Sequence, residues 1–93
     1  MNDLKDTIEF MTSDDYKRRF VAEYWQTKIR YEKLKAFNTK IEAADMALCS
    51  PKNISMPAHD CPTDLLVHQQ TVMVEYLHIL EVRAVIEGID LEE

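Results

Sequence analysis

The stretch Tyr16–Lys40, which reads YKRRFVAEYWQTKIRYEKLKAFNTK, decides the fold of this chain. It contains no glycine or proline, and the first proline after it is Pro51, so the sequence predicts one long helix over residues 14–46. Mostly apolar and aromatic residues, with one threonine and one asparagine among them, recur along it in alternating steps of four and three, a pattern typical of a seam that packs against a second helix. The seam positions are Phe20, Tyr24, Thr27, Tyr31, Leu34, Asn38 and Ile41.

The rest of the chain favours helices as well. Gly88 is the one glycine among 93 residues and there are three prolines, far fewer than turn-rich β architectures need. We therefore expect an all-α fold in one domain, residues 1–93: an antiparallel helical hairpin with a short N-terminal helix. The remaining elements are expected as a short helix at residues 2–12, a loop at 47–60 and a final helix at 62–87.

The expected boundaries follow from local signals. Thr12 and Ser13 offer a hydroxyl cap for the long helix, and Asp14 and Asp15 would then occupy its first turn. Pro62 suits the first position of the final helix, and Gly88 its C-terminal stop. In the short helix, one apolar face is expected from Leu4, Ile8 and Met11.

Each long helix also carries a second apolar line that a two-helix hairpin leaves exposed. The line on the long helix is Val21, Trp25 and Ile29, and that on the final helix is Leu65, Val72, Ile79 and Ile86. Exposure of such lines is costly, so we expect a homo-oligomer in which another chain covers them. The alternative is a monomeric bundle in which the short first helix covers one of the lines.

Positive charge is concentrated in the same stretch that forms the seam. Residues 16–40 carry eight of the eleven Lys and Arg residues and two Glu residues, a local charge of +6 in a chain of net charge −6. Cations interleaved with flat rings suit an anionic ligand that has stacking surface, such as a nucleotide. The acidic remainder argues against duplex nucleic acid as a partner. The alternative is a solvated helix of mixed charge.

Spacing selects the candidate ligand residues within the stretch. Tyr24 lies beside Lys28 on adjoining faces, and Tyr31 and Lys35 repeat this pair seven residues later. A structural role remains the alternative, because Tyr24 and Tyr31 fall on the seam and the lysines could simply solubilise the helix.

Patterns for catalysis and for metal binding are missing from the sequence. There is no Gly-rich phosphate loop, no GxSxG and no Glu-x-x-His pair, so we expect neither an enzyme nor a cofactor. Cys49, His59, Cys61 and His68 have irregular spacing, and no metal site is expected. No apolar run is long enough for a membrane span and no secretory segment is present, which favours the cytoplasm.

Two motifs in order resemble the phage-encoded anti-CBASS sponge family. They are YKRRFVAEYWQTKIRYEKLKAF, Tyr16–Phe37, and LLVHQQTVMVEYLHILEVR, Leu65–Arg83. The resemblance implies a helical protein, assembled as a homohexamer in the host cytoplasm, that binds cyclic di- or trinucleotide immune signals without cleaving them. It further implies a dinucleotide-type pocket near Tyr16, Arg19, Lys33 and Lys35, and a second site at Arg83. Other phage sponges sequester ADP-ribose-derived signals, and the same chemistry would serve there.

The leading hypothesis is therefore non-catalytic sequestration of a cyclic nucleotide immune signal. The loop at 47–60 and the extension from Val85 depart from the family pattern and leave the ligand's ring size open. The alternative is a protein–protein interaction module of a phage or mobile element, acting on a host protein through the Trp25 and Ile29 line. The candidate ligand residues are Tyr16, Arg19, Tyr24, Lys28, Lys33, Lys35 and Arg83.

Overall fold

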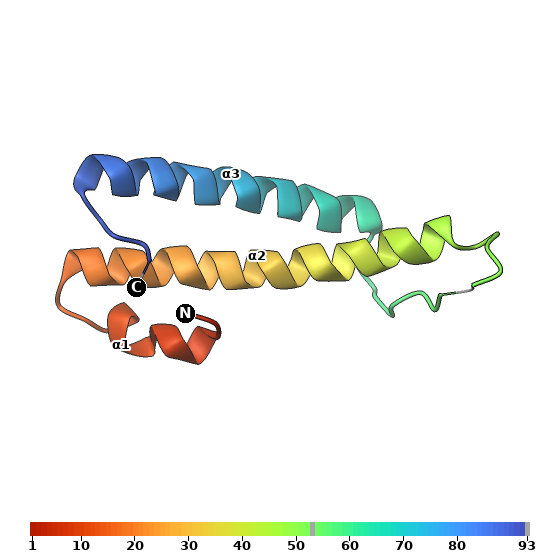
Figure 1. Ribbon diagram of the computed structural model, residues 1–93, viewed down its shortest axis with the longest axis horizontal. Coiled ribbons are helices and arrows are strands. Elements are labelled where there is room, and N and C mark those ends of the chain that lie inside the picture. Colours follow the sequence, from red (N-terminus) through yellow and green to blue (C-terminus); the bar gives the residue numbers. More distant parts are fainter. Residues whose placement is uncertain (53, 93) are drawn as a thin grey trace.

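Two long antiparallel helices form the body of the protein, and a short N-terminal segment lies against one of them (Figure 1). The computed structural model describes residues 1–52 and 54–92, and all regular structure within them is helical. This confirms the all-α class and the hairpin. The elements are a 3₁₀ helix η1 (Leu4–Thr7), α1 (Ile8–Met11), α2 (Tyr16–Met46) and α3 (Thr63–Glu87).

Helix α2 begins two residues later than expected because a carboxylate, and not a hydroxyl, caps it. The side chain of Asp15 accepts a hydrogen bond from the backbone N–H of Lys17 at 3.0 Å. Ser13 instead accepts from the N–H of Asp15 at 3.0 Å and so shapes the turn before the helix. At the start of α3, Pro62 occupies the cap position with φ −57° and ψ 139°, one residue before the first helical residue.

The second apolar line of α2 is covered by the chain itself. Val21 and Ile29 are buried, and the half-buried Trp25 donates its indole N–H to the carbonyl of Leu91 at 2.7 Å. The covering parts are the N-terminal segment, which lies across α2 from α3, and the C-terminal tail, which returns to α2 (Figure 1). The expectation that another chain covers this line is thus wrong, and the bundle alternative holds for α2.

The N-terminal segment packs through a face other than the expected one. Ile8 and Met11 are exposed, whereas Thr7 is buried and Phe10 packs against the core. Thr7 can be buried because its hydroxyl donates to the carbonyl of Leu4 at 2.7 Å and accepts from the side-chain amide of Gln26 at 2.9 Å. The η1 turn rotates the segment away from the regular helical spacing that the sequence pattern assumed.

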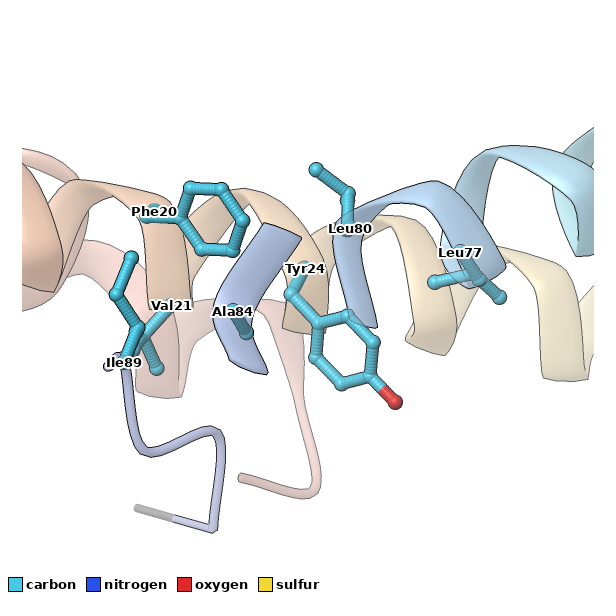
Figure 2. Packing of buried hydrophobic residues seen from close by; sticks show 7 residues of the cluster. All are labelled: Phe20, Val21, Tyr24, Leu77, Leu80, Ala84 and Ile89. Carbon is cyan, nitrogen blue, oxygen red and sulfur yellow. The ribbon is translucent and has the colours of Figure 1, made fainter. Parts of the chain in front are cut away.

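The main core lies at one end of the hairpin, where α2 begins and α3 ends (Figure 2). The expected seam is confirmed there by Phe20 and Tyr24 on α2, which are 2% and 5% exposed. The tail belongs to this core because Gly88 adopts a left-handed conformation, φ 69°, that turns the chain and inserts Ile89. The buried residues of the cluster are Phe20, Val21, Tyr24, Leu77, Leu80, Ala84 and Ile89.

The second apolar line of α3 remains uncovered in the single chain. Leu65, Val72, Ile79 and Ile86 are 57%, 46%, 55% and 78% exposed. Apolar though this helix is, no helix in the described part of the chain is long and apolar enough to cross a membrane.

Candidate functional site

Tyr16 and Arg83, which the family resemblance assigned to separate pockets, meet at the end of the hairpin. The Tyr16 hydroxyl accepts from Nη2 of Arg83 and donates to Oε1 of Glu87, each at 2.8 Å. Arg83 also donates from Nε to Oε2 of Glu87 at 3.2 Å, and its guanidinium lies 4.9 Å from the ring centre of Phe20. The hydrogen bond to Glu87 is the main cause of the raised pKa of both Tyr16 and Arg83. The Glu87 carboxylate offsets the positive charge of Arg83, so an anionic ligand here must compete with this carboxylate for the Arg83 guanidinium.

Tyr24 combines a buried ring with a hydroxyl at the edge of a groove. Its hydroxyl donates to Oε2 of Glu81 at 2.9 Å and accepts from the Lys28 ammonium at 3.5 Å. Burial, followed by the hydrogen bond to Glu81, raises the pKa of Tyr24 to about 12. The hydroxyl is therefore protonated at neutral pH and can act as a donor or an acceptor.

Lys28 is the cation that lies between two hollows. Its Nζ lies 5.6 Å from the ring centre of Tyr24 and 5.2 Å from that of Trp25, so both rings stabilise the charge. On one side is a groove of about 380 Å³ between α2 and α3, and on the other a hollow of about 240 Å³ beside the N-terminal segment. We call these the inter-helix groove and the N-terminal hollow. Glu32 and Lys28 line both of them.

The inter-helix groove is lined by residues of both helices. Tyr31 adds a half-buried ring, and His78 and Glu81 add polar groups from α3. These side chains offer a stacking surface, hydroxyl and imidazole hydrogen bonds, and one ammonium group. The full lining is Tyr24, Lys28, Tyr31, Glu32, Val74, Leu77, His78 and Glu81.

The N-terminal hollow brings a second predicted lysine to the same area. Lys33 lines it together with Trp25, Ile29 and the first two residues of the chain. Two lysines and an indole ring thus surround a small cavity with one carboxylate, Glu32, which leaves the cavity's side chains with a local charge of +1.

The other two predicted residues lie elsewhere. The Arg19 guanidinium donates from Nη1 to the carbonyl of Ser13 at 2.8 Å, so it fastens the turn before α2. Lys35 is exposed and lines neither of the two hollows beside Lys28. The structure therefore groups Tyr24, Lys28 and Lys33 around one area, pairs Tyr16 with Arg83, and separates Arg19 and Lys35 from both groups.

The folded chain places at surface hollows three further residues that the sequence did not select as candidate ligand residues, namely Trp25, Lys17 and Arg18. Trp25 was assigned to a contact surface, yet it forms the wall between Lys28 and the tail. Arg18 lies 4.4 Å from the ring centre of Phe10 and, with Lys17, lines a hollow of about 200 Å³ against the tail. The alternation of cations and rings in YKRRF pointed to this end of the helix, but the partners Phe10 and Asp90 could not be paired with it by spacing.

The arrangement is suited to holding a ligand. Within residues 1–52 and 54–92 no group of three or more His, Cys, Asp or Glu side chains is placed to hold a metal ion, and Cys49 and Cys61 are free thiols. The polar groups around Lys28 can donate and accept hydrogen bonds and supply a stacking surface.

Fold and site together define a small helical-hairpin protein with surface hollows in which lysines adjoin aromatic rings. The profile of the Sequestin family matches residues 14–86, which include both long helices almost entirely, and the chain belongs to this family. The family name indicates sequestration, that is, binding and not catalysis. Searches of curated proteins and of solved structures give no match to the chain.

Proposed function

We propose that this protein sequesters a small cyclic nucleotide immune signal and acts as a phage anti-defence sponge in the host cytoplasm. Membership of a family named for sequestration supports the binding part of this proposal. The sequence resemblance to anti-CBASS sponges supports the kind of ligand, either a cyclic di- or trinucleotide or an ADP-ribose-derived signal. Such a protein works stoichiometrically, so tight binding matters and turnover does not.

One observation carries the proposal, namely the position of Lys28 above two aromatic rings and between two hollows. A phosphate of the ligand binds the Lys28 ammonium, and Lys33 adds a second cation on the side of the N-terminal hollow. A base stacks on Tyr31 in the groove or on Trp25 in the hollow. The groove, at about 380 Å³, lies within the range of small-molecule sites, ~300–1,000 Å³.

Glu32 and Glu81 set the selectivity of this area. Both carboxylates line the inter-helix groove, so the groove as a whole is not a strong anion trap. A ligand with few phosphates and with donor groups on its bases and riboses uses these acceptors, whereas a compact polyanion such as triphosphate is repelled. This favours a cyclic signal over a linear nucleoside triphosphate.

Substitution of Lys28 tests the proposal directly. We expect calorimetric titration with cyclic di- and trinucleotides and cyclic ADP-ribose isomers to give submicromolar binding for at least one ligand. Lys28→Ala should weaken that binding at least tenfold, because it removes the cation shared by both hollows. Lys33→Ala should have a smaller effect, since it lines one hollow.

Lys40→Ala is the matched control, because Lys40 is an exposed lysine on the same helix and lines neither hollow. The Lys40→Ala variant should bind the ligand with the same affinity as the unmodified protein. Absence of binding across the whole panel would refute the proposal, and equal affinities for the Lys28 and Lys40 variants would move the site away from Lys28. Recovery of intact ligand after denaturing the complex would separate sequestration from hydrolysis.

A second function, contact with a host protein, is favoured by a different surface from the one first expected. Trp25 and Ile29 are covered by the N-terminal segment and the tail, so that line cannot serve as a contact surface while the tail is docked. The exposed apolar side chains of α3 could serve instead.

A further inference from the structure

The side-chain oxygen of Asn38 is buried and lacks a hydrogen-bond donor. Asn38 is 7% exposed, and its Oδ1 has no partner within the described residues 1–52 and 54–92. The orientation of the amide is fixed, because its Nδ2 donates to the backbone carbonyl of Leu66 at 3.2 Å, and a carbonyl can only accept. Nδ2 also donates to Oε1 of Gln70 at 2.9 Å. An unpaired buried acceptor costs free energy, so Oδ1 marks a position where a donor from a ligand would be stabilised.

Asn38 lines a hollow of about 350 Å³ between the end of α2 and the beginning of α3. We call it the distal hollow, because it lies toward the end of the hairpin that is far from both chain termini (Figure 1). It shares no lining residue with the inter-helix groove or the N-terminal hollow. Its volume lies within the range of small-molecule sites, ~300–1,000 Å³.

The polar groups around the distal hollow are mainly hydrogen-bond acceptors. The hydroxyls of Thr39 and Thr71 donate their protons to the backbone carbonyls four residues earlier, at 2.8 Å and 3.1 Å, and so present only lone pairs. Glu42 and Asp45 add two carboxylates. Among the described residues neither carboxylate has an ion pair, and no lysine or arginine lines the hollow. The distal hollow therefore suits a ligand with positive charge and several donors.

An alkylammonium ion meets these requirements. It brings three N–H donors and a positive charge on an aliphatic chain. Asn38, Glu42 and Asp45 follow one another at intervals of four and three residues, so they share one face of α2. Ile41 and Val67 add apolar side chains to the lining, against which an aliphatic chain can pack.

We propose that the distal hollow binds a small aliphatic diamine. One ammonium group pairs with the carboxylates of Glu42 and Asp45, and the other donates to Oδ1 of Asn38. The second contact requires a shift of the Gln70 side chain, which is half-buried and bonded to the same amide. The site is separate from Lys28 and does not depend on the nucleotide proposal.

Calorimetric titration with putrescine, a linear diamine, tests the site. The unmodified protein should show saturable binding, which the double variant Glu42→Gln/Asp45→Asn should weaken about tenfold or more, because both charges are lost while the side-chain shapes are kept. Both residues are exposed, so the variant should keep its helical circular dichroism. Absence of saturable binding to the unmodified protein, or equal affinity for the double variant, would overturn the proposal.

Glu75→Gln is the matched control, because Glu75 is an exposed carboxylate on α3 that lines neither the distal hollow nor the two hollows beside Lys28. This variant should bind putrescine with the affinity of the unmodified protein. The uncharged analogue 1,4-butanediol should not bind. Equal binding of the diol would overturn the proposal, as would binding of magnesium chloride in place of putrescine.

Hydrogen exchange gives a readout that loosely bound counterions would not change. A diamine in the distal hollow contacts both helices, so saturating putrescine should slow amide exchange at residues 34–44 of α2 and leave residues 20–29 unchanged. The side-chain amide signals of Asn38 should also shift in an NMR titration, since its oxygen accepts a new hydrogen bond. Unchanged exchange at residues 34–44 together with unshifted Asn38 signals would overturn the proposal.

Discussion

At Tyr24 the ring and the hydroxyl group have different environments, and the difference determines how the residue titrates. The ring is part of the core, while the hydroxyl reaches Glu81 and Lys28 at the edge of the inter-helix groove. Burial and the neighbouring carboxylate both disfavour the phenolate, which is why the pKa rises from 10.0 to about 12.

This raised pKa predicts a loss of stability at alkaline pH. The folded state holds the phenolic proton more tightly than the unfolded state, so the stabilising effect is complete below about pH 10 and is lost as the pH rises toward 12. Between these values, the free energy of unfolding should fall more steeply in the unmodified protein than in Tyr24→Phe. Urea denaturation at a series of pH values measures the free energy of unfolding of both proteins. Parallel curves for the two proteins would contradict the assignment.

Residue-level prediction from sequence succeeded where a pattern repeats and failed where two distant side chains meet. The seam positions Phe20 and Tyr24 follow from helical spacing alone and are buried. The pairing of Tyr16 with Arg83 could not be foreseen, since 67 residues separate them and their hydrogen bonds depend on the register of α2 against α3. Asn38 helps to set that register: its side-chain amide donates to the carbonyl of Leu66 at 3.2 Å and to Gln70 at 2.9 Å.

At the scale of elements, the short C-terminal tail contributes to the core and also holds the side chain of Trp25. It follows Gly88, whose left-handed conformation allows the N–H of Ile89 to bond the carbonyl of Ala84 at 2.8 Å. The same turn directs Ile89 into the core and the Leu91 carbonyl to Trp25. The sequence predicted the helix stop at Gly88, but the short acidic tail after it gave no sign that Ile89 and Leu91 would pack against the core.

Gly88→Ala should lower the free energy of unfolding by about 1 kcal/mol, because an alanine Cβ disfavours the left-handed conformation. A Cβ at this position meets no atom within 4 Å, so the cost is conformational and not a clash. Gly88→Asn should cost less, since asparagine tolerates this conformation. Chemical denaturation of the unmodified protein and of the two Gly88 variants measures these differences in the free energy of unfolding. Equal midpoints for all three would show that the turn does not constrain the fold.

At the scale of the whole molecule, the core is unevenly distributed along a hairpin 53 Å long. The residues of the main cluster come from the beginning of α2, the end of α3 and the tail (Figure 2). In the other half, α2 buries Asn38, Ile41 and Ala44, whereas the described α3 residues before Leu77 are exposed or half-buried. The distal half of the hairpin is therefore held by fewer buried apolar side chains.

This asymmetry predicts two rates of amide hydrogen exchange within one helix. Amides of α2 at residues 20–29 should be protected longer than those at residues 34–44, because opening of the distal half exposes little apolar surface. Mass spectrometry of peptides from the two halves measures the difference. Uniform protection along α2 would show that the hairpin opens as one unit.

The indole of Trp25 gives the molecule a built-in optical reporter. It is the one tryptophan of the chain, it forms a wall of the N-terminal hollow, and its N–H is bonded to the tail. Its emission should therefore respond both to a ligand that stacks in the hollow and to release of the tail. Arrival of a ligand and undocking of the C-terminus can thus be followed in the unlabelled protein, in one cuvette.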